Sequence, residues 1–138
     1  MNTTDSSPRL LARIPLSVRW RDMDSFGHVN NAMYLSYIEE ARVRWLATIP
    51  GFSMQDRCLP VLVNADINYR RPITWPAELM VELFIMRLGS SSVTIGHRIL
   101  DADDESVLYC DGSATAAWID THAGKSVPLP DAIRAASS

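Results

Sequence analysis

A single run of helical periodicity does most to limit what this chain can fold into. Apolar residues recur at helical spacing over Asn31–Thr48 with no Gly or Pro among them, and Pro50 and Gly51 then end the run. Asn30 or Asn31 can cap the amino end of this helix. We find no other long helical run, so a single helix must be buried by strands.

Strand-like alternation lies on both sides of this helix. Residues 11–21 alternate before it, with Trp20 on the face expected to be buried. After it, the expected strands cover residues 61–70, 79–88, 93–99 and 107–119, and an acidic hairpin tip falls at 101–105. Short turns imply antiparallel neighbours. The order of elements therefore predicts an α+β domain in which a five-stranded antiparallel sheet wraps one long helix.

The length of the chain suits one domain. We expect a single domain over residues 1–138, with loose ends at 1–10 and 131–138. The hydrophobic content of 47% supports a core that needs no disulfides. One helix covers little of a five-stranded sheet, so we also expect a homo-oligomer, either a homodimer or a homotetramer.

Charge, cysteine content and motif searches exclude several protein classes. The 13 basic and 16 acidic residues leave no basic excess for binding nucleic acid. Cys58 and Cys110 are too few for a disulfide framework and lack zinc spacing, so they are expected to be free. His97 is expected to be a structural histidine with its hydrogen bonds satisfied, and no histidine pair has metal-binding spacing. No apolar segment suits a signal peptide or a membrane span. We therefore expect a cytoplasmic protein with no membrane contact, metal or cofactor.

The densest polar segment runs from Asp22 to Asn31, between the first strand and the helix. The amino end of a helix offers unpaired N–H groups that can stabilise an anion or a developing oxyanion. Asp24 lies on a loop that can fold back over this end, Gly27 permits the turn, and His28 adds a titratable donor. This arrangement suits acyl transfer or hydrolysis, although the same side chains could serve only as caps.

Residues 19–34, RWRDMDSFGHVNNAMY, and the following EEAR at 39–42 resemble the signature of hotdog-fold acyl-CoA thioesterases. The resemblance is to the 4-hydroxybenzoyl-CoA thioesterase type and its long-chain acyl-CoA relatives. NYRRP at 68–72 and LGSSS at 88–92 extend it over nearly the whole domain. The resemblance implies the hotdog fold, a thioester hydrolase that needs no cofactor, and sheets that pair edge to edge between subunits.

The resemblance also implies site residues. Asp24 would act as general base or nucleophile toward the thioester carbonyl, the backbone N–H of Asn31 or its neighbour would bind the oxyanion, and His28 would shape the loop. The positions that it assigns to substrate binding are Asn30, Tyr34, Glu39, Arg70, Arg71, Ser91 and Ser92. Among these, the acidic position would support the site from a distance or from the partner subunit. The serines would contact the pantetheine arm, and the arginines, with Arg87, would suit the CoA phosphates.

The implied substrate is an acyl-CoA or an acyl carrier protein thioester, and the sequence does not name the acyl group. Two other functions remain open, a non-catalytic acyl-CoA binding module and a hotdog enoyl-CoA hydratase. Asp24 weighs against a pure binder, because such a protein has little use for a carboxylate beside an oxyanion site. Hydratases of this fold usually space their acid–histidine pair differently and often double the domain.

Overall fold

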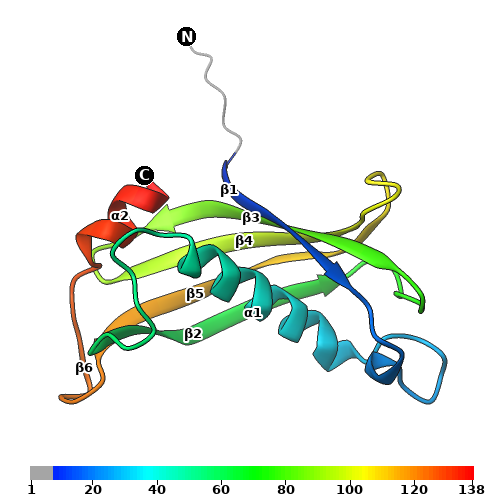
Figure 1. The fold of residues 1–138 in the computed structure, drawn as a ribbon, viewed down its shortest axis with the longest axis horizontal. Helices are drawn as coiled ribbons and strands as arrows, with labels where there is room; N and C mark the ends of the chain where they lie inside the picture. Colours follow the sequence, from blue (N-terminus) through cyan, green and yellow to red (C-terminus); the bar gives the residue numbers. More distant parts are fainter. Residues whose placement is uncertain (1–7) are drawn as a thin grey trace, which may run out of the picture.

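The computed structural model describes residues 8–138, which form one curved sheet, one long helix and one short helix (Figure 1). In chain order the elements are β1 (Arg9–Ser17), a 3₁₀ turn (Trp20–Asp22), α1 (Asn31–Ala47), β2 (Cys58–Tyr69), β3 (Glu78–Leu88), β4 (Ser92–Asp101), β5 (Leu108–Asp120), β6 (Lys125–Ser126) and α2 (Asp131–Ser137). The predicted order of one strand, one long helix and four strands is confirmed.

Every pair of neighbouring strands in this sheet is antiparallel. The strand order is β1-β3-β4-β5-β2, and the two-residue β6 pairs with the end of β5. The predicted five-stranded antiparallel sheet is therefore confirmed, with β6 as an addition that the sequence pattern did not indicate. Because β1 and β2 stand at the two ends of this order, they form the two edges of the sheet.

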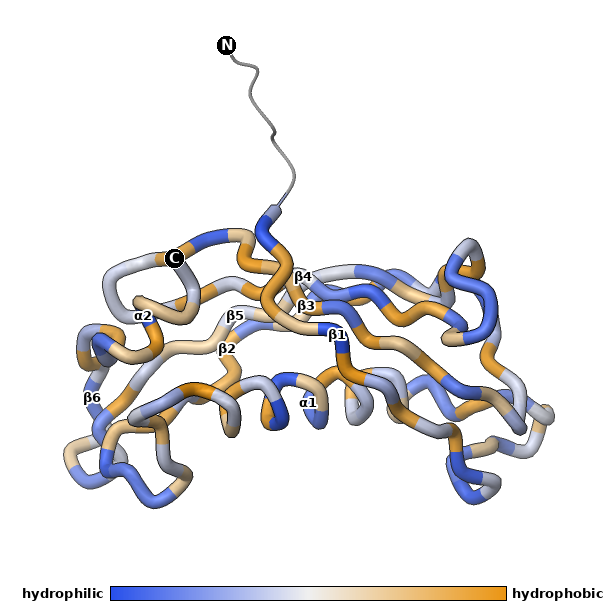
Figure 2. Tube along the Cα trace, turned by 45° about the horizontal axis from the view of Figure 1, so that its top comes forward, coloured by the Kyte–Doolittle hydropathy of each residue, from blue (hydrophilic) through white to orange (hydrophobic). Residues whose placement is uncertain are grey.

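Helix α1 lies across the concave side of the sheet, which arches over it (Figure 2). It begins one residue after Asn30 and ends at Ala47, so the predicted range is wrong by one residue only. Ile38 and Ala41 on its inner face are fully buried, and Trp45 is 5% exposed. Burial of a large apolar side chain contributes about 1.5–3 kcal/mol, which makes this stripe the main attachment of the helix.

The first strand ends earlier than predicted. β1 stops at Ser17, and Trp20 is 71% exposed in the 3₁₀ turn rather than buried. The physical reason is local competition, because the carboxylate of Asp22 accepts a hydrogen bond from the backbone N–H of Arg19 at 3.0 Å. That bond turns the chain away from the sheet before the alternating pattern has run out.

The expectation of loose termini is wrong where the structure describes them. Arg9 and Leu10 pair with β3, whereas residues 1–7 of that expectation lie outside the described residues. Residues 131–137 form α2, in which Ile133 is fully buried and Arg134 donates a hydrogen bond to the carbonyl of Gly89 at 2.9 Å. The carboxyl end is therefore part of the core at that end of the sheet.

Strand β2 is far more exposed than its alternating pattern predicts. Val61, Leu62 and Val63 are 42%, 48% and 60% exposed, although all three are large apolar residues. The cause is its place at the edge, since α1 lies nearest β1 and β3 and leaves the β2 side open. Among the described residues, no strand pairs with the outer edge of β2, which also carries these apolar side chains.

The described part of the chain contains no helix that is long and apolar enough to span a membrane. Both cysteines are free thiols, and Cys110 is fully buried. Within residues 8–138, no group of three or more His, Cys, Asp or Glu side chains is arranged to hold a metal ion.

Candidate active site

The loop before α1 is folded back over the amino end of the helix by backbone hydrogen bonds. The N–H of Asn30 donates to the carbonyl of Asp22 at 2.9 Å, and the N–H of Asp24 donates to the carbonyl of His28 at 2.7 Å. Gly27 closes the turn with a φ of +83°, a conformation that glycine adopts without steric cost. The predicted return of this loop over the helix is confirmed.

A cavity of about 500 Å³ opens between this loop, the first turn of α1 and the end of β2. Its lining includes six of the residues that the sequence assigned to the site, namely Asp24, His28, Asn31, Tyr34, Arg70 and Arg71. Val29 and Pro72 also line it, and sequence reasoning missed both. Pro72 comes from another element, so only the spacing of the 68–72 segment in the resemblance could have pointed to it.

The loop around Asp24 holds one of the two oxygens of its carboxylate. Its Oδ1 accepts hydrogen bonds from the N–H groups of Phe26 at 2.8 Å and His28 at 3.2 Å. Its Oδ2 accepts no hydrogen bond from residues 8–138. A carboxylate oriented through one oxygen and open at the other is suited to take a proton or attack a carbonyl carbon.

The first turn of α1 leaves one backbone donor free. The side chain of Asn30 caps the N–H of Ala32 at 2.9 Å, and the carbonyl of Asn30 accepts from the N–H of Met33 at 2.8 Å. The N–H of Asn31 donates to no acceptor in the described part of the chain. It lies at the positive end of a 17-residue helix, where it can bind an anion or an oxyanion. Asn30 thus serves as the N-cap and does not line the cavity.

Two tyrosines build one wall of the cavity. The hydroxyl of Tyr34 donates to the carbonyl of Arg71 at 3.2 Å and accepts from the N–H of Ile73 at 3.1 Å. The hydroxyl of Tyr69 donates to the carbonyl of Asn31 at 3.1 Å, and the two rings meet edge to face at 5.0 Å. Because both hydroxyls are engaged with the backbone, these residues offer a substrate an apolar wall.

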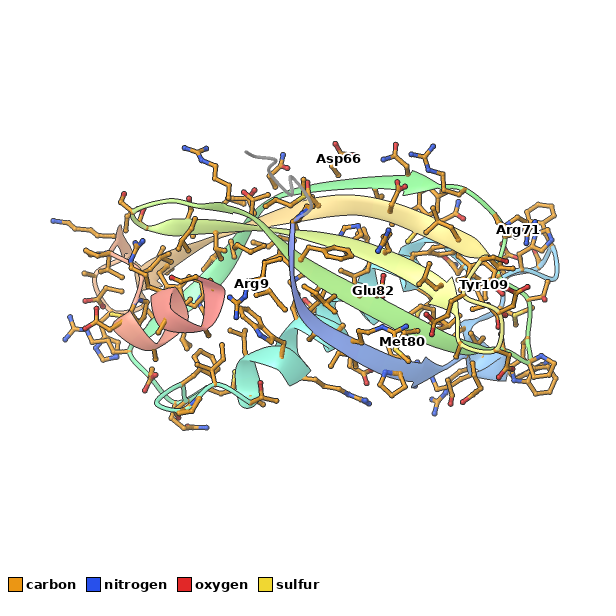
Figure 3. The ribbon with its side chains drawn as sticks, turned by 90° about the horizontal axis from the view of Figure 1, so that it is seen from above. Arg9, Asp66, Arg71, Met80, Glu82 and Tyr109 are labelled. Atoms are coloured by element: carbon orange, nitrogen blue, oxygen red, sulfur yellow. The ribbon has the colours of Figure 1, made fainter. Side chains whose placement is uncertain are left out.

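The two arginines at the mouth of the cavity differ in their partners. Arg70 forms an ion pair with Asp111 at 3.1 Å, whereas the Arg71 guanidinium forms none within residues 8–138. Arg71 is held by its backbone N–H, which donates to the carbonyl of Tyr109 at 3.2 Å, and both residues lie at this end of the sheet (Figure 3). Arg71 is therefore the better placed of the two cations to bind an anionic group.

Besides the N-cap Asn30, three predicted residues lie outside this cavity. Glu39 lies two turns further along α1 and lines other cavities. Ser92 begins β4 and Ser91 precedes it, and the backbone N–H of Trp118 donates to the carbonyl of Ser91 at 2.8 Å. This is the end of the sheet that carries α2, opposite to the loop with Asp24 (Figure 1). Within one protomer these residues do not meet the catalytic candidates.

Asp22 has a role that sequence reasoning missed. It is 3% exposed, and its carboxylate accepts from the Arg19 guanidinium at 2.9 Å and from the Tyr37 hydroxyl at 2.7 Å. Burial alone would raise the pKa of Asp22, but these hydrogen bonds outweigh it and lower the pKa below the ordinary value. Burial and the neighbouring carboxylate raise the pKa of Tyr37. The sequence feature that could have indicated this role is the spacing of an acidic residue three positions after Arg19, which is typical of a capping arrangement.

The expectation of a satisfied structural histidine at position 97 is wrong. His97 is 2% exposed, yet neither ring nitrogen has a hydrogen-bond partner in residues 8–138. Burial, and then the charge of Arg42, lower the pKa of His97 to about 4, so the ring is neutral near pH 7. An alternating strand pattern indicates that a side chain is buried, but it does not indicate whether that side chain has a hydrogen-bond partner.

Comparison with known proteins finds thioesterases among the relatives of this chain. The long-chain acyl-CoA thioesterase FadM of Escherichia coli is 30% identical over 121 residues, covering 86% of this chain and 91% of the relative. A proposed acyl-CoA thioesterase from Xanthomonas campestris is 59% identical, with a TM-score of 0.80, and covers 88% of this chain and 100% of its own. A thioesterase from Thermus thermophilus, solved with coenzyme A and Zn, is 32% identical, with a TM-score of 0.78 and coverage of 93% and 92%.

A family comparison covers nearly all of the described chain. Residues 18–137 match the thioesterase-like superfamily, a range that includes the loop with Asp24, the whole of α1 and α2. The hotdog arrangement of one long helix wrapped by an antiparallel sheet is the fold of the solved relatives. On both grounds, this chain belongs to the thioesterase-like superfamily.

Proposed function

We propose that this protein hydrolyses acyl-CoA thioesters to a free acid and coenzyme A, with Asp24 and the backbone N–H of Asn31 as its catalytic groups. The observation that carries the proposal is the cavity that both groups line. Asp24 supplies a carboxylate oxygen that accepts no hydrogen bond from residues 8–138, and Asn31 supplies a helix-end N–H that donates to no acceptor among them. The named activity of the E. coli relative supports the substrate class.

The chemistry follows from these two groups. The thioester carbonyl oxygen accepts a hydrogen bond from the backbone N–H of Asn31. This bond stabilises the negative charge that develops on the oxygen as the carbonyl carbon becomes tetrahedral. Asp24 either takes a proton from the attacking water or attacks the carbonyl carbon itself. The C–S bond then breaks and the thiolate of coenzyme A leaves. If Asp24 attacks, water hydrolyses the resulting anhydride in a second step, so both routes give the same products.

The outer part of the cavity suits the carrier. Arg71, whose guanidinium forms no ion pair among the described residues, and Arg70, paired with Asp111, line the cavity where we expect the phosphate groups of coenzyme A to bind. The relative from T. thermophilus was solved with coenzyme A, which supports this carrier. An acyl carrier protein thioester presents the same pantetheine arm and remains a second substrate form. His28 donates its backbone N–H to Asp24 and so helps to orient the carboxylate.

We also propose that the protein acts as a homodimer, or as a homotetramer built from such dimers, joined through β2. The exposed apolar residues Val61, Leu62 and Val63 and the unpaired backbone of this edge favour pairing with a second sheet. Such a dimer could bring Glu39 of the partner subunit toward this site. Light scattering at micromolar concentration is expected to give at least twice the protomer mass of 15.4 kDa. A mass of one protomer would contradict the dimer.

The activity can be tested by following free thiol. The wild type is incubated with a panel of straight-chain and aryl acyl-CoAs, and the Asp24→Asn variant is measured on the best of them. We expect the wild type to release coenzyme A and kcat of the variant to fall about 10²–10⁴-fold, as is typical for loss of a general base. Binding without thiol release would indicate a non-catalytic binding module, and hydration of an enoyl-CoA would indicate a hydratase.

A matched control is available in the hairpin between β4 and β5. Asp104 also accepts the N–H of the residue two positions on, Ser106, at 3.1 Å, but it is exposed and lies outside the cavity. Asp104→Asn is expected to leave the rate unchanged. Equal rates for Asp24→Asn and Asp104→Asn would show that Asp24 only shapes its loop.

A further inference from the structure

A second chamber lies further along α1, between the helix and strands β2, β4 and β5, with a volume of about 230 Å³. Its walls include the apolar side chains of Leu35, Leu62 and Ala114. Two basic side chains, Arg42 and His97, also line it. The roles proposed above for the loop and the first turn of α1 use neither of them. We call this space the Arg42–His97 chamber.

His97 is built into this chamber as an unused hydrogen-bonding group. It shares the inward face of β4 with the buried Ile95 and Ile99, and it is itself 2% exposed. Neither of its ring nitrogens bonds to any group in residues 8–138. A Cβ atom on Gly112 would lie only 2.9 Å from Nε2, so the glycine leaves room for the ring at this position. A buried donor without a partner lowers stability, which favours an external acceptor as its partner.

Arg42 supplies a positive charge to the same space. Its side chain is half-buried, and this burial lowers the pKa of Arg42, whereas the negative charge of Glu39 on the same helix opposes that shift. Among the described residues, Arg42 forms no ion pair, whereas its neighbour on the helix, Arg44, pairs with Glu40. A guanidinium in a partly apolar chamber favours a planar anion that it can bind through two N–H groups.

The chamber lies further along the same helix than the candidate active site. From Asn31 to Ser36, which lines the chamber, α1 advances about 7.5 Å at 1.5 Å per residue. Long helical side chains lean toward the amino end of their helix, so Arg42 leans toward the catalytic loop. An acyl chain whose thioester lies at Asn31 and which follows the helix toward β2 therefore brings its far end to Arg42 and His97.

We propose that the Arg42–His97 chamber binds a carboxylate at the far end of the acyl group, so that the enzyme prefers thioesters of dicarboxylic acids. This inference rests on the proposed thioesterase function and specifies its substrate class. The guanidinium of Arg42 pairs with the distal carboxylate, and the imidazole N–H of His97 donates a second hydrogen bond. Glu39 lies on the exposed rim of the chamber, where its charge opposes the ligand and is screened by solvent.

The test compares octanedioyl-CoA with octanoyl-CoA, which differ only in the distal carboxylate. The measured quantity is the ratio of their kcat/KM values, and we expect it to exceed about 10 in the wild type, since a charged hydrogen-bonded pair is worth at least this factor. Arg42→Met retains most of the aliphatic stem and removes the charge, and it should lower the ratio about 10–100-fold. Arg44→Met, on the same helix but outside the chamber, should leave the ratio unchanged.

His97→Phe separates a ligand-binding role from a structural one. If His97 donates to the substrate, this variant should lose preference for octanedioyl-CoA without a lower melting temperature, because an unpaired polar group is replaced by an apolar ring. A lower melting temperature with an unchanged ratio would mean that His97 is structural and would overturn its part in the proposal.

Binding of uncleavable thioether analogues of both substrates decides the question independently of turnover. A wild-type enzyme that cleaves no acyl-CoA of the full panel refutes the proposed function, whereas the ratio of the two dissociation constants still tests the chamber. A ratio near one in either assay overturns the inference. So does an Arg42→Met variant that dissociates in light scattering and keeps the wild-type ratio, because Arg42 would then serve the subunit interface.

Discussion

Asp22 and Asp24 lie two residues apart in one loop, and the structure gives them opposite surroundings. Asp22 is 3% exposed and accepts hydrogen bonds from Arg19 and Tyr37. Asp24 is only half-buried, and its Oδ2 faces no donor from residues 8–138. Saturation makes the first carboxylate a fixed support for the loop, and the free oxygen makes the second available for chemistry. We infer that hydrogen-bond saturation, rather than residue type, distinguishes the supporting carboxylate of Asp22 from the proposed catalytic carboxylate of Asp24.

The same contrast recurs between Asp22 and His97. Both are buried ionisable groups beside α1, but the described residues supply several donors to Asp22 and no partner to His97. Buried polar groups are normally satisfied, so the exception marks a place where a ligand can act. Four variants test whether this contrast holds.

The largest expected effect is on activity, at Asp24. Asp24→Asn keeps an amide oxygen for the N–H groups of Phe26 and His28, so its free energy of unfolding should change by less than about 1 kcal/mol. Its hydrolysis rate should nevertheless fall about 10²–10⁴-fold, because the amide cannot accept a proton from water. Chemical denaturation checks the predicted stability, and thiol release from the same preparation checks the predicted rate. A large loss of stability would show that Asp24, like Asp22, has a structural role in the loop.

Asp22→Asn should show the reverse pattern. Loss of the buried charge leaves the Arg19 guanidinium without its partner, and an amide is a poorer acceptor for the Tyr37 hydroxyl. We expect the free energy of unfolding to fall by about 2–3 kcal/mol, less than for a fully buried pair because Arg19 is half exposed. Urea denaturation measures this loss. An unchanged midpoint would show that the loop does not depend on Asp22.

His97 and Asp22 should also differ in the pH range over which they affect stability. The pKa of His97 is about 4 in the folded chain against 6.5 in the unfolded one, so the unfolded state binds the extra proton. Stability should therefore fall as the pH drops from about 6.5 to 4, by up to about 3 kcal/mol. Because the pKa of Asp22 is lowered in the folded chain, its contribution to the free energy of unfolding is lost as the pH falls below 3.8 and its carboxylate becomes protonated.

Melting temperatures of wild type and His97→Phe between pH 7 and 4 isolate this contribution. The variant should lose less stability on acidification than the wild type. Parallel curves would show that His97 titrates normally and is not isolated from water and partners.

The smallest expected effect is at the hydroxyl that completes the Asp22 site. Tyr37→Phe removes the hydrogen bond of 2.7 Å to the carboxylate and leaves the ring in the core. We expect a loss of about 1–2 kcal/mol, since the remaining donors from Arg19 still satisfy the carboxylate in part. A double variant with Asp22→Asn should lose less than the sum of the two single losses, because both changes remove the same bond.

Local pattern was enough to predict much of this protein. Helical spacing and the cap at Asn30 placed α1 within one residue, and alternation with short turns predicted the antiparallel sheet. The polar loop and the helix end suggested Asp24 and Asn31, because a helix terminus next to a carboxylate is a local property. The prediction of β1 was less accurate, since the bond between Arg19 and Asp22 competes locally with the strand ladder.

The tertiary structure decided which of these residues meet. It brought Arg71 and Tyr34 to Asp24 from separate elements and placed Ser91 and Ser92 at the opposite end of the sheet. It also buried Asp22 among donors and left His97 and Arg42 facing an open chamber. Sequence periodicity fixes which face of a strand or helix is buried, but a hydrogen-bond partner is set by strand register and by how far α1 lies from β2. Those are long-range properties, and they distinguish the saturated carboxylate of Asp22 from the imidazole of His97, which has no partner in residues 8–138.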